Sequence, residues 1–511
     1  MAGGGSLARG AMVPVGEIKR SRAHAMSAGT AWIRRARRAI HRRGAIAPQE
    51  RERTATRWYT RCVTRGGRGA PPREGDSDTR RLIAFLKDER PLPTVVALAF
   101  LVRLLYCFLV FPRIGDAMHW RGVDDGYDEL ARGVLGGHGY VKAPGRPGDL
   151  LTPPGYAYFL SGLYAAFGVE TQEGPRLWVA QAALDALTCG IIYAIGGLLL
   201  GNRRAGLLAA LAWALYPQIA VYSARIAPEV LFTLLFVLLF VAWLALERRG
   251  GAARALLAGA VWAALALTKE KAILLPLVLL ARLLWVRRAD PRRFAREAAA
   301  FALAALVVLS PWLYRGYRLT GGFVPITLRG GRALAEGIAR DLSGADREMV
   351  EKFERNPPRP PAPGDTLPAL SEEERAERTR LLRERESSRL AGAVAEIARS
   401  PVAFARKALV RLAAYWYWGQ PRVILGNALV NIPLLVAAAF GLRAAWGAAP
   451  ASVALLLIAY MNVLHALTVV RMRYSLPVMP FVILFAAYAV SRARRASRSE
   501  SATGAAPAGA G

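Results

Sequence analysis

A series of long apolar segments constrains this fold more than any other feature of the chain. Ten such segments follow residue 90, and most are long enough to cross a bilayer as a helix. They are 94–111, 177–200, 205–221, 230–246, 255–267, 272–285, 298–313, 423–442, 449–467 and 476–490. Segments 255–267 and 272–285 are shorter than the roughly 17 to 25 residues that a span needs, so we expect them to be tilted or partly buried. The sequence predicts an all-α integral membrane protein, a polytopic helical bundle of about 10 transmembrane helices with two extracytoplasmic loop regions.

Composition favours a membrane as the partner of this chain. Its 511 residues are 54% hydrophobic and carry a formal net charge of +32. In a soluble chain that charge would suggest nucleic acid, but here the apolar residues fall in long runs. We therefore expect membrane lipids as partners and no nucleic acid. The 3 Cys residues are widely spaced without a CxxC pair, so we expect neither a disulfide framework nor a zinc site.

Arginines gather in every second loop, and this alternation predicts the orientation of the bundle. Short loops rich in Lys and Arg stay on the cytoplasmic side of a membrane. The Arg-rich loops contain residues 203–204, 248–254, 287–296, 443 and 492–498. We therefore expect a multi-pass protein of the plasma (inner) membrane with both termini in the cytoplasm.

The same alternation divides the chain into five parts. They are a basic disordered cytoplasmic tail (1–90), an N-terminal transmembrane module (94–318) with a catalytic first outer loop (113–176), an extracytoplasmic loop with an amphipathic helix (319–403), the C-terminal transmembrane helices (404–491) and a second disordered tail (492–511). The segment TPPGYAYFLSGLYAAFG in the first outer loop is too short to span, so we expect an interfacial or re-entrant helix. In the second outer region, Ser371 and Glu374 have capping-box spacing before a charged helix.

An acidic cluster follows the first span, close to where a lipid head group would lie. It consists of Asp124, Asp125, Asp128 and Glu129. A carboxylate held there can act as a base, because an acceptor hydroxyl that attacks an anomeric carbon must lose its proton. The alternative is a solvated helix start, since Asp and Glu favour the first turn of a helix.

Several cations at the predicted outer ends of spans run against the trend that keeps positive charge inside. They are Arg225, Lys269, Lys271, Arg471 and Arg473. A phosphate or pyrophosphate at the outer leaflet would account for them, because Arg binds phosphate oxygens bidentately and Lys supplies a point charge. The alternative is snorkelling, or pairing with the neighbouring Glu229 and Glu270.

Other polar residues have simpler interpretations. Arg103, Gln181 and Asp185 lie inside apolar runs, where joining helices is the expected role. The His residues have no metal-ligand spacing, so we assign no metal site and leave open only a divalent cation as a cofactor. The chain has neither a P-loop nor a dinucleotide-binding GxGxxG motif, which argues against ATP-driven transport.

Motifs spread from about Leu98 to Val490 resemble a known family. They include DDGYDELARGVLGGHGY, TPPGYAYFLSGLYAAFG, APEVLFTLL, ALTKEKAILLPLVLL and RMRYSLPVMP, in that order. Together they resemble the bacterial members of glycosyltransferase family 39. This is the dolichyl-phosphate-mannose protein mannosyltransferase-like group of the C-type glycosyltransferase superfamily, which is akin to the aminoarabinose lipid A transferases.

The resemblance implies an enzyme that transfers a hexosyl or pentosyl group from a polyprenyl-phosphate-linked donor, with inversion. The acceptor would be a lipid, a glycan or a protein on the extracytoplasmic face. Asp124 or Asp125 would be the base. Lys269, Arg471 and Arg473 would contact the carrier phosphate, with Lys271 and Arg225 as further candidates. The matching motifs also contain Tyr127, Tyr156 and Glu229, which we expect to bind substrate.

Two other functions fit parts of the pattern. A transporter or flippase of a lipid-linked saccharide also needs cations at a head-group site. A non-catalytic scaffold with an Arg-rich tail that binds anionic lipid would leave the acidic cluster unexplained. Substitution of Asp124 and Asp125 discriminates among them, because only an enzyme loses turnover while it keeps its fold.

Overall fold

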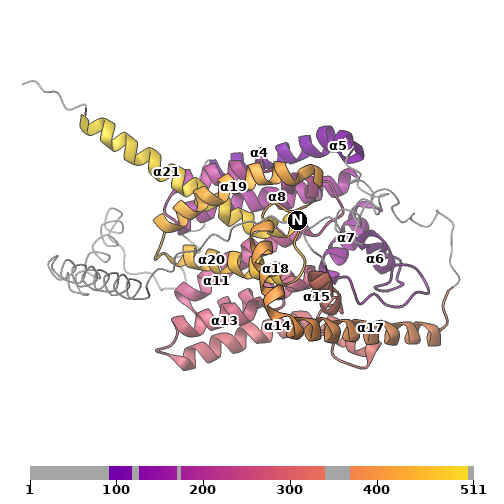
Figure 1. The fold of residues 1–511 in the computed structure, drawn as a ribbon. Helices are drawn as coiled ribbons and strands as arrows, with labels where there is room; N and C mark the ends of the chain where they lie inside the picture. Colours follow the sequence, from indigo (N-terminus) through magenta and orange to yellow (C-terminus); the bar gives the residue numbers. More distant parts are fainter. Residues whose placement is uncertain (1–90, 118–125, 170–173, 340–368, 420, 505–511) are drawn as a thin grey trace, which may run out of the picture. The chain divides into compact units, whose positions relative to one another are not determined.

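The computed structural model describes residues 91–117, 126–169, 174–339, 369–419 and 421–504. All regular elements within these ranges are helices (Figure 1). The basic segment 1–90 and the candidate bases Asp124 and Asp125 lie outside the described residues.

Helices occupy each of the ten apolar segments, and seven of the described spans are long and apolar enough to cross a membrane. The first runs through α4 (Pro91–Leu105), η1 (Tyr106–Val110) and into α5 (Phe111–Ala117), and the second through α8 (Pro175–Ala194) and η2 (Ile195–Leu199). The others are α11 (Glu229–Arg249), α14 (Pro291–Thr320), α19 (Pro421–Ala444), α20 (Ala449–Leu467), and η4 (Met472–Val478) with α21 (Met479–Gly504).

The remaining three apolar segments form shorter or broken helices. α9 (Arg203–Ala214) and α10 (Pro217–Ser223) meet at 55° and count as an eighth span if taken together. Pro217 starts the second helix, because proline lacks the N–H that would continue the first. α12 (Ala252–Thr268) and α13 (Leu275–Val286) have 17 and 12 residues, as expected for the two short segments. The predicted all-α polytopic bundle is therefore confirmed, and the chain is a multi-pass membrane protein.

A buried ion pair joins three of the membrane helices. The Arg103 guanidinium on α4 donates to the Asp185 carboxylate on α8 at 2.5 Å and to the Trp213 carbonyl on α9 at 2.8 Å. The Trp213 indole N–H donates to the second Asp185 oxygen at 2.8 Å. An isolated charge in this environment is costly, so these mutual bonds allow all three side chains to be buried. The predicted role of Arg103 and Asp185 in joining helices is confirmed.

Four further helices belong to the two predicted outer regions. They are α6 (Tyr127–Leu135), α7 (Pro154–Phe167), α15 (Gly330–Ala339) and α17 (Glu372–Arg399) (Figure 1). α18 (Pro401–Ala414) lies mostly in the part predicted as C-terminal transmembrane helices, yet it has only 14 residues and is not among the described spans. α7 has only 14 residues, in keeping with an interfacial or re-entrant helix. The predicted capping box of Ser371 and Glu374 starts α17.

The two outer regions pack on one another although they are far apart in the sequence. The Leu328 N–H donates to the Leu150 carbonyl at 2.8 Å. From α14, the Arg315 guanidinium donates to the carbonyls of Asp149 and Tyr140, both at 3.0 Å. Burial raises the pKa of Tyr140, whose neutral hydroxyl donates to the Pro153 carbonyl at 3.0 Å. These bonds hold the start of α7 against the second outer region.

Candidate active site

A small cavity lies where the predicted outer ends of α11, α12 and α20 meet the start of α6. Its volume is about 60 Å³. It is lined by Tyr127, Pro228, Phe232, Lys269, Glu270, Lys271, Arg329, Met461, His465, Arg473, Tyr474 and Pro477. We call this hollow the cationic cavity, because four of its lining residues are Lys or Arg and only one is acidic.

Lys269 and Lys271 reach the cavity because the chain leaves its helix there. α12 ends at Thr268, Lys269 is extended, and the 3-10 turn η3 (Glu270–Ala272) follows before α13. A close approach of α7 fixes this break. A side chain at Gly155 would place its Cβ 2.8 Å from the Thr268 hydroxyl and 3.0 Å from the Leu267 carbonyl. Only glycine therefore fits in the Pro-Pro-Gly-Tyr motif at this contact.

The buried carboxylate of Glu229 holds two of the cavity's cations, Lys269 and Arg473. It is 1% exposed and accepts a hydrogen bond from the Lys269 ammonium at 2.9 Å, while the Arg473 guanidinium lies 4.0 Å from the same oxygen. Glu229 is the first residue of α11, where the helix dipole favours a negative charge. One carboxylate thus holds two cations in place, and the cavity keeps an excess of positive charge.

Aromatic rings line the same cavity and support Lys269. The Lys269 ammonium lies 5.6 Å from the ring centroids of both Phe232 and Tyr474, within the range of a cation–π interaction. His465 stacks on Tyr474 at 4.4 Å and on Tyr415 at 5.7 Å. Burial raises the pKa of Tyr415 well above its usual value, and its hydroxyl donates to the Tyr474 carbonyl at 2.8 Å. The rings thereby position one wall of the cavity.

The two tyrosines predicted to bind substrate have different surroundings. Tyr127 lines the cavity as the first residue of α6, after Gly126 with a φ of 84° that favours glycine. The Tyr156 ring packs edge-on against it at 5.1 Å. Tyr156 is fully buried, and its hydroxyl donates to the Gln181 side chain and accepts from the Ala227 N–H, both at 3.1 Å. Tyr156 is therefore a buried residue that packs against Tyr127 and is not part of the cavity lining.

Asp128 joins α6 to α7. It accepts a 2.5 Å hydrogen bond from the Tyr164 hydroxyl and a 2.9 Å bond from the Arg132 guanidinium. Both carboxylate oxygens are thus used in packing at the start of the helix. Asp128 is therefore a packing residue, and the predicted bases Asp124 and Asp125 lie outside the described residues.

Three of the five predicted phosphate-binding cations line the cavity, and two do not. Lys269, Lys271 and Arg473 do so. The Arg225 guanidinium lies 5.8 Å from the Tyr222 ring, and its carbonyl accepts from the Gln181 amide at 2.8 Å. Arg471 is exposed just before η4. Neither Arg225 nor Arg471 is part of the lining.

Three further lining residues, Arg329, His465 and Tyr474, were not among the predicted site residues. Arg329 precedes α15 in a loop region with many other basic residues, so only its tertiary position distinguishes it. Tyr474 lies within the RMRYSLPVMP motif, next to the predicted cation Arg473, and that proximity was the available signal.

No group of three or more His, Cys, Asp or Glu residues in the described ranges has an arrangement that would hold a metal ion. A divalent cation as cofactor stays a prediction.

Residues 152–314 match the family model described as dolichyl-phosphate-mannose-protein mannosyltransferase. The resemblance predicted from the motifs is confirmed. The matched region contains Glu229, Lys269 and Lys271 of the site, and the contribution of Arg473 comes from beyond it. This match supports the predicted resemblance over that part of the chain.

Two crystal structures of ArnT from Cupriavidus metallidurans match the chain with low sequence identity and low TM-scores. The one bound to undecaprenyl phosphate has 16% sequence identity and a TM-score of 0.36, and the match covers 78% of this chain and 77% of that chain. The apo structure has 16% identity and a TM-score of 0.35, with 82% and 78% covered. No curated protein matches the chain.

Proposed function

We propose that the chain transfers a hexosyl or pentosyl group from a polyprenyl-phosphate-linked donor to a lipid, glycan or protein acceptor. The transfer takes place on the extracytoplasmic face of the plasma membrane, with both termini of the protein in the cytoplasm. The cationic cavity carries this proposal, because Lys269, Lys271 and Arg473 meet Arg329 at the ends of apolar helices. A phosphate on a membrane-embedded carrier presents the complementary charge at that depth.

The cations serve the departure of the carrier. When the bond between the anomeric carbon and the phosphate oxygen breaks, that oxygen keeps the electron pair and the phosphodiester becomes a monoester with one more negative charge. Lys269 and Arg473 are already fixed by Glu229, so they stabilise the developing charge without reorganising. A guanidinium and an ammonium together offer both a fork of donors and a point charge.

The acceptor is activated from the side of α6. Its hydroxyl oxygen forms the new bond to the anomeric carbon, and its proton passes to a carboxylate, for which Asp124 and Asp125 are the candidates. Asp125 precedes Tyr127 by two residues, and Tyr127 lines the cavity. A single displacement of this kind inverts the anomeric configuration.

The test is transfer of radiolabelled sugar from polyprenyl-phosphate donors in membranes that contain the protein. We expect label to reach a lipid, glycan or protein fraction, and Asp124→Asn or Asp125→Asn to abolish the transfer while the protein stays folded. The variant Asp290→Asn is a control, because Asp290 caps the predicted inner end of α14. If well-folded protein consumes no donor, the proposal fails and transport of a lipid-linked saccharide takes its place.

A further inference from the structure

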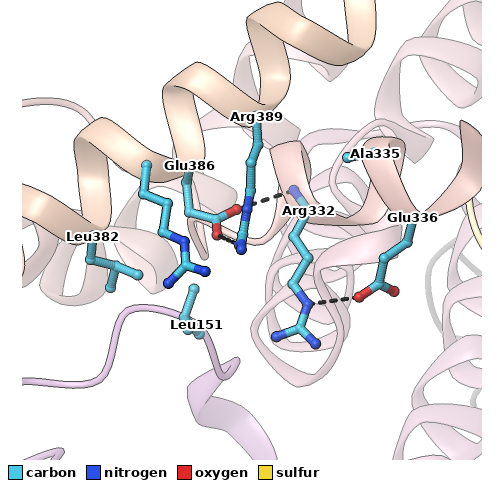
Figure 2. Close-up of a pocket in the computed structure, with 8 residues that line it drawn as sticks. Leu151, Arg332, Ala335, Glu336, Leu382, Glu386 and Arg389 are labelled. Carbon is cyan, nitrogen blue, oxygen red and sulfur yellow. Dashed lines mark hydrogen bonds and ion pairs between the residues drawn. The ribbon is translucent and has the colours of Figure 1, made fainter. Parts of the chain in front are cut away.

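A second hollow lies beside the cationic cavity, between α15 and α17. Its volume is about 540 Å³, in the range typical of small-molecule sites. It is lined by Leu151, Arg332, Ala335, Glu336, Leu382, Arg385, Glu386 and Arg389 (Figure 2). We call it the α15–α17 groove. None of these residues has a role in the transfer reaction proposed above.

The groove is built around a fixed carboxylate. Glu386 is buried, and its two oxygens accept from the Arg389 guanidinium at 2.5 Å and from the Arg332 backbone N–H at 3.1 Å (Figure 2). The two helices touch at backbone distance, because a Cβ at Gly331 would lie 2.3 Å from the Glu386 carbonyl oxygen. The walls of the groove are therefore held together without a ligand.

One of the three arginines that line the groove has no acidic partner within it. The Arg332 guanidinium donates to Glu336 at 2.7 Å, and Arg389 is bound to Glu386. Arg385 is exposed at the groove, and the part of the chain that the structure describes gives it neither an ion pair nor a hydrogen bond. A guanidinium presents a planar fork of donors that matches a carboxylate or a phosphate.

The other walls are apolar. Leu151, Ala335 and Leu382 contribute them. A sugar ring suits such a surface, since its faces carry C–H groups while its edge carries hydroxyls, and ligand sites commonly combine apolar walls with a few placed polar groups. Charge and shape together favour a sugar that bears an acidic group.

The groove and the cationic cavity are connected through the start of α15. Arg329 lines the cavity, and Arg332 lines the groove one helical turn further along α15. Leu151 lies in the segment that leads into α7, whose Tyr156 supports Tyr127 in the cavity. The start of α15 therefore links the groove to the cavity.

We propose that the α15–α17 groove binds the acceptor, and that this acceptor is a glycan with an anionic group, a carboxylate or a phosphate, bound by Arg385. This inference rests on the proposed glycosyl transfer, because it gives the groove its role in that reaction. It selects a glycan among the three acceptor classes that the sequence left open.

Binding of small anionic sugars to the purified full-length protein tests the proposal. The probes are trigalacturonic acid and mannose 6-phosphate, with maltotriose and mannose as neutral counterparts, and the protein is held in phosphatidylcholine nanodiscs. We expect the charged sugars to bind and Arg385→Gln to weaken them at least tenfold, the usual scale of one charge-assisted contact. The matched control is Arg378→Gln, because Arg378 is exposed on the same helix outside the groove lining.

Four results would overturn the proposal. If neutral sugars bind as tightly as charged ones, the anionic group of the sugar has no role in binding. Equal effects of Arg385→Gln and Arg378→Gln would reduce the binding to general surface charge. Loss of probe binding in Arg473→Gln but not in Arg385→Gln would place the sugars in the cationic cavity. Binding only to vesicles that contain phosphatidylglycerol would likewise replace the glycan with a lipid surface.

The failure of this inference and that of the proposed function can be told apart. Probe binding needs no donor, so protein that binds the charged sugars through Arg385 but consumes no donor refutes the transfer reaction alone. Protein that transfers sugar from the donor but shows no Arg385-dependent binding refutes the acceptor groove alone.

Discussion

At the scale of single residues, the pair of Lys269 and Glu229 is central to the site. The carboxylate is almost completely buried and the ammonium is 14% exposed, so each depends on the other for compensation of its charge. Lys269→Gln removes a proposed phosphate contact and also leaves Glu229 with the more distant Arg473 as its cation.

We expect Lys269→Gln to lower sugar transfer at least 100-fold and the free energy of unfolding by about 3 kcal/mol, the scale of a broken buried pair. The measurements are label transfer and thermal unfolding in the same membranes. Lys269→Arg keeps the charge and should recover part of both quantities. If Lys269→Gln transfers sugar at the normal rate, the ammonium has no role at the phosphate.

Arg471 and Arg473 provide a matched comparison, since they are two residues apart and only Arg473 lines the cavity. We expect Arg473→Gln to raise the KM for the donor at least tenfold through the loss of a charged contact, and Arg471→Gln to change it less than threefold. Steady-state kinetics with varied donor concentration measure both. Equal effects would show that the guanidinium of Arg471 also reaches the carrier.

Polarity against an apolar background was enough to predict some of these residues but not others. Lys269, Lys271 and Arg473 stand out because they end apolar runs on the side where positive charge is disfavoured. Arg329 does not end an apolar run, so it does not stand out in this way. For Tyr156, no feature of the sequence distinguishes a buried supporting residue from one that contacts substrate. Those roles depend on neighbours that lie far away in the sequence.

At the scale of elements, the position of α15 depends on close contact with α17. A Cβ at Gly331 would overlap the Glu386 carbonyl, whereas a Cβ at the adjacent Gly330 meets nothing within 4 Å. Both residues lie in the first turn of the same helix. The two glycines therefore separate the effect of packing from that of helix propensity.

We expect Gly331→Ala to lower the free energy of unfolding by about 1 to 3 kcal/mol, the range for overpacking, and to lower sugar transfer because Arg329 and Arg332 shift with the helix. Gly330→Ala should leave stability unchanged or raise it slightly, since alanine favours a helix. Thermal unfolding of the two variants decides the matter. Equal stability would contradict the close packing.

The apolar segments predicted where the helices lie better than where they break. Residues 205–221 read as one segment, yet the chain bends by 55° between α9 and α10. Hydropathy does not register this bend, because Pro217 interrupts the backbone hydrogen bonds without interrupting the apolar run. In the same way, α21 continues past the expected boundary at residue 491 to Gly504, because charged residues do not prevent helix formation.

At the scale of the whole molecule, the proposed face of transfer depends on the orientation of the bundle. The sequence predicts the loop before α7 outside and the start of α14 inside. Lys142 and Arg292 are exposed positions in these two regions. Cys107 and Cys189 are buried, so in a Cys62→Ser background they should react slowly with a thiol reagent.

We expect a cysteine at position 142 to react with a membrane-impermeant maleimide on intact cells, and a cysteine at position 292 to react only after permeabilisation. Gel-shift labelling of Lys142→Cys and Arg292→Cys measures this. The opposite pattern would place the cationic cavity on the cytoplasmic side and contradict the proposed face of transfer.

The proposed reaction requires that the cationic cavity hold the carrier phosphate. The measurement is the phosphorus NMR signal of a polyprenyl phosphate in nanodiscs with the full-length protein, compared with the double variant Lys269→Gln/Arg473→Gln. We predict a shifted and broadened signal with the unsubstituted protein and the free signal with the variant, because these two cations flank the site and share Glu229. An equal shift with both proteins would contradict the account, since the phosphate would then bind elsewhere.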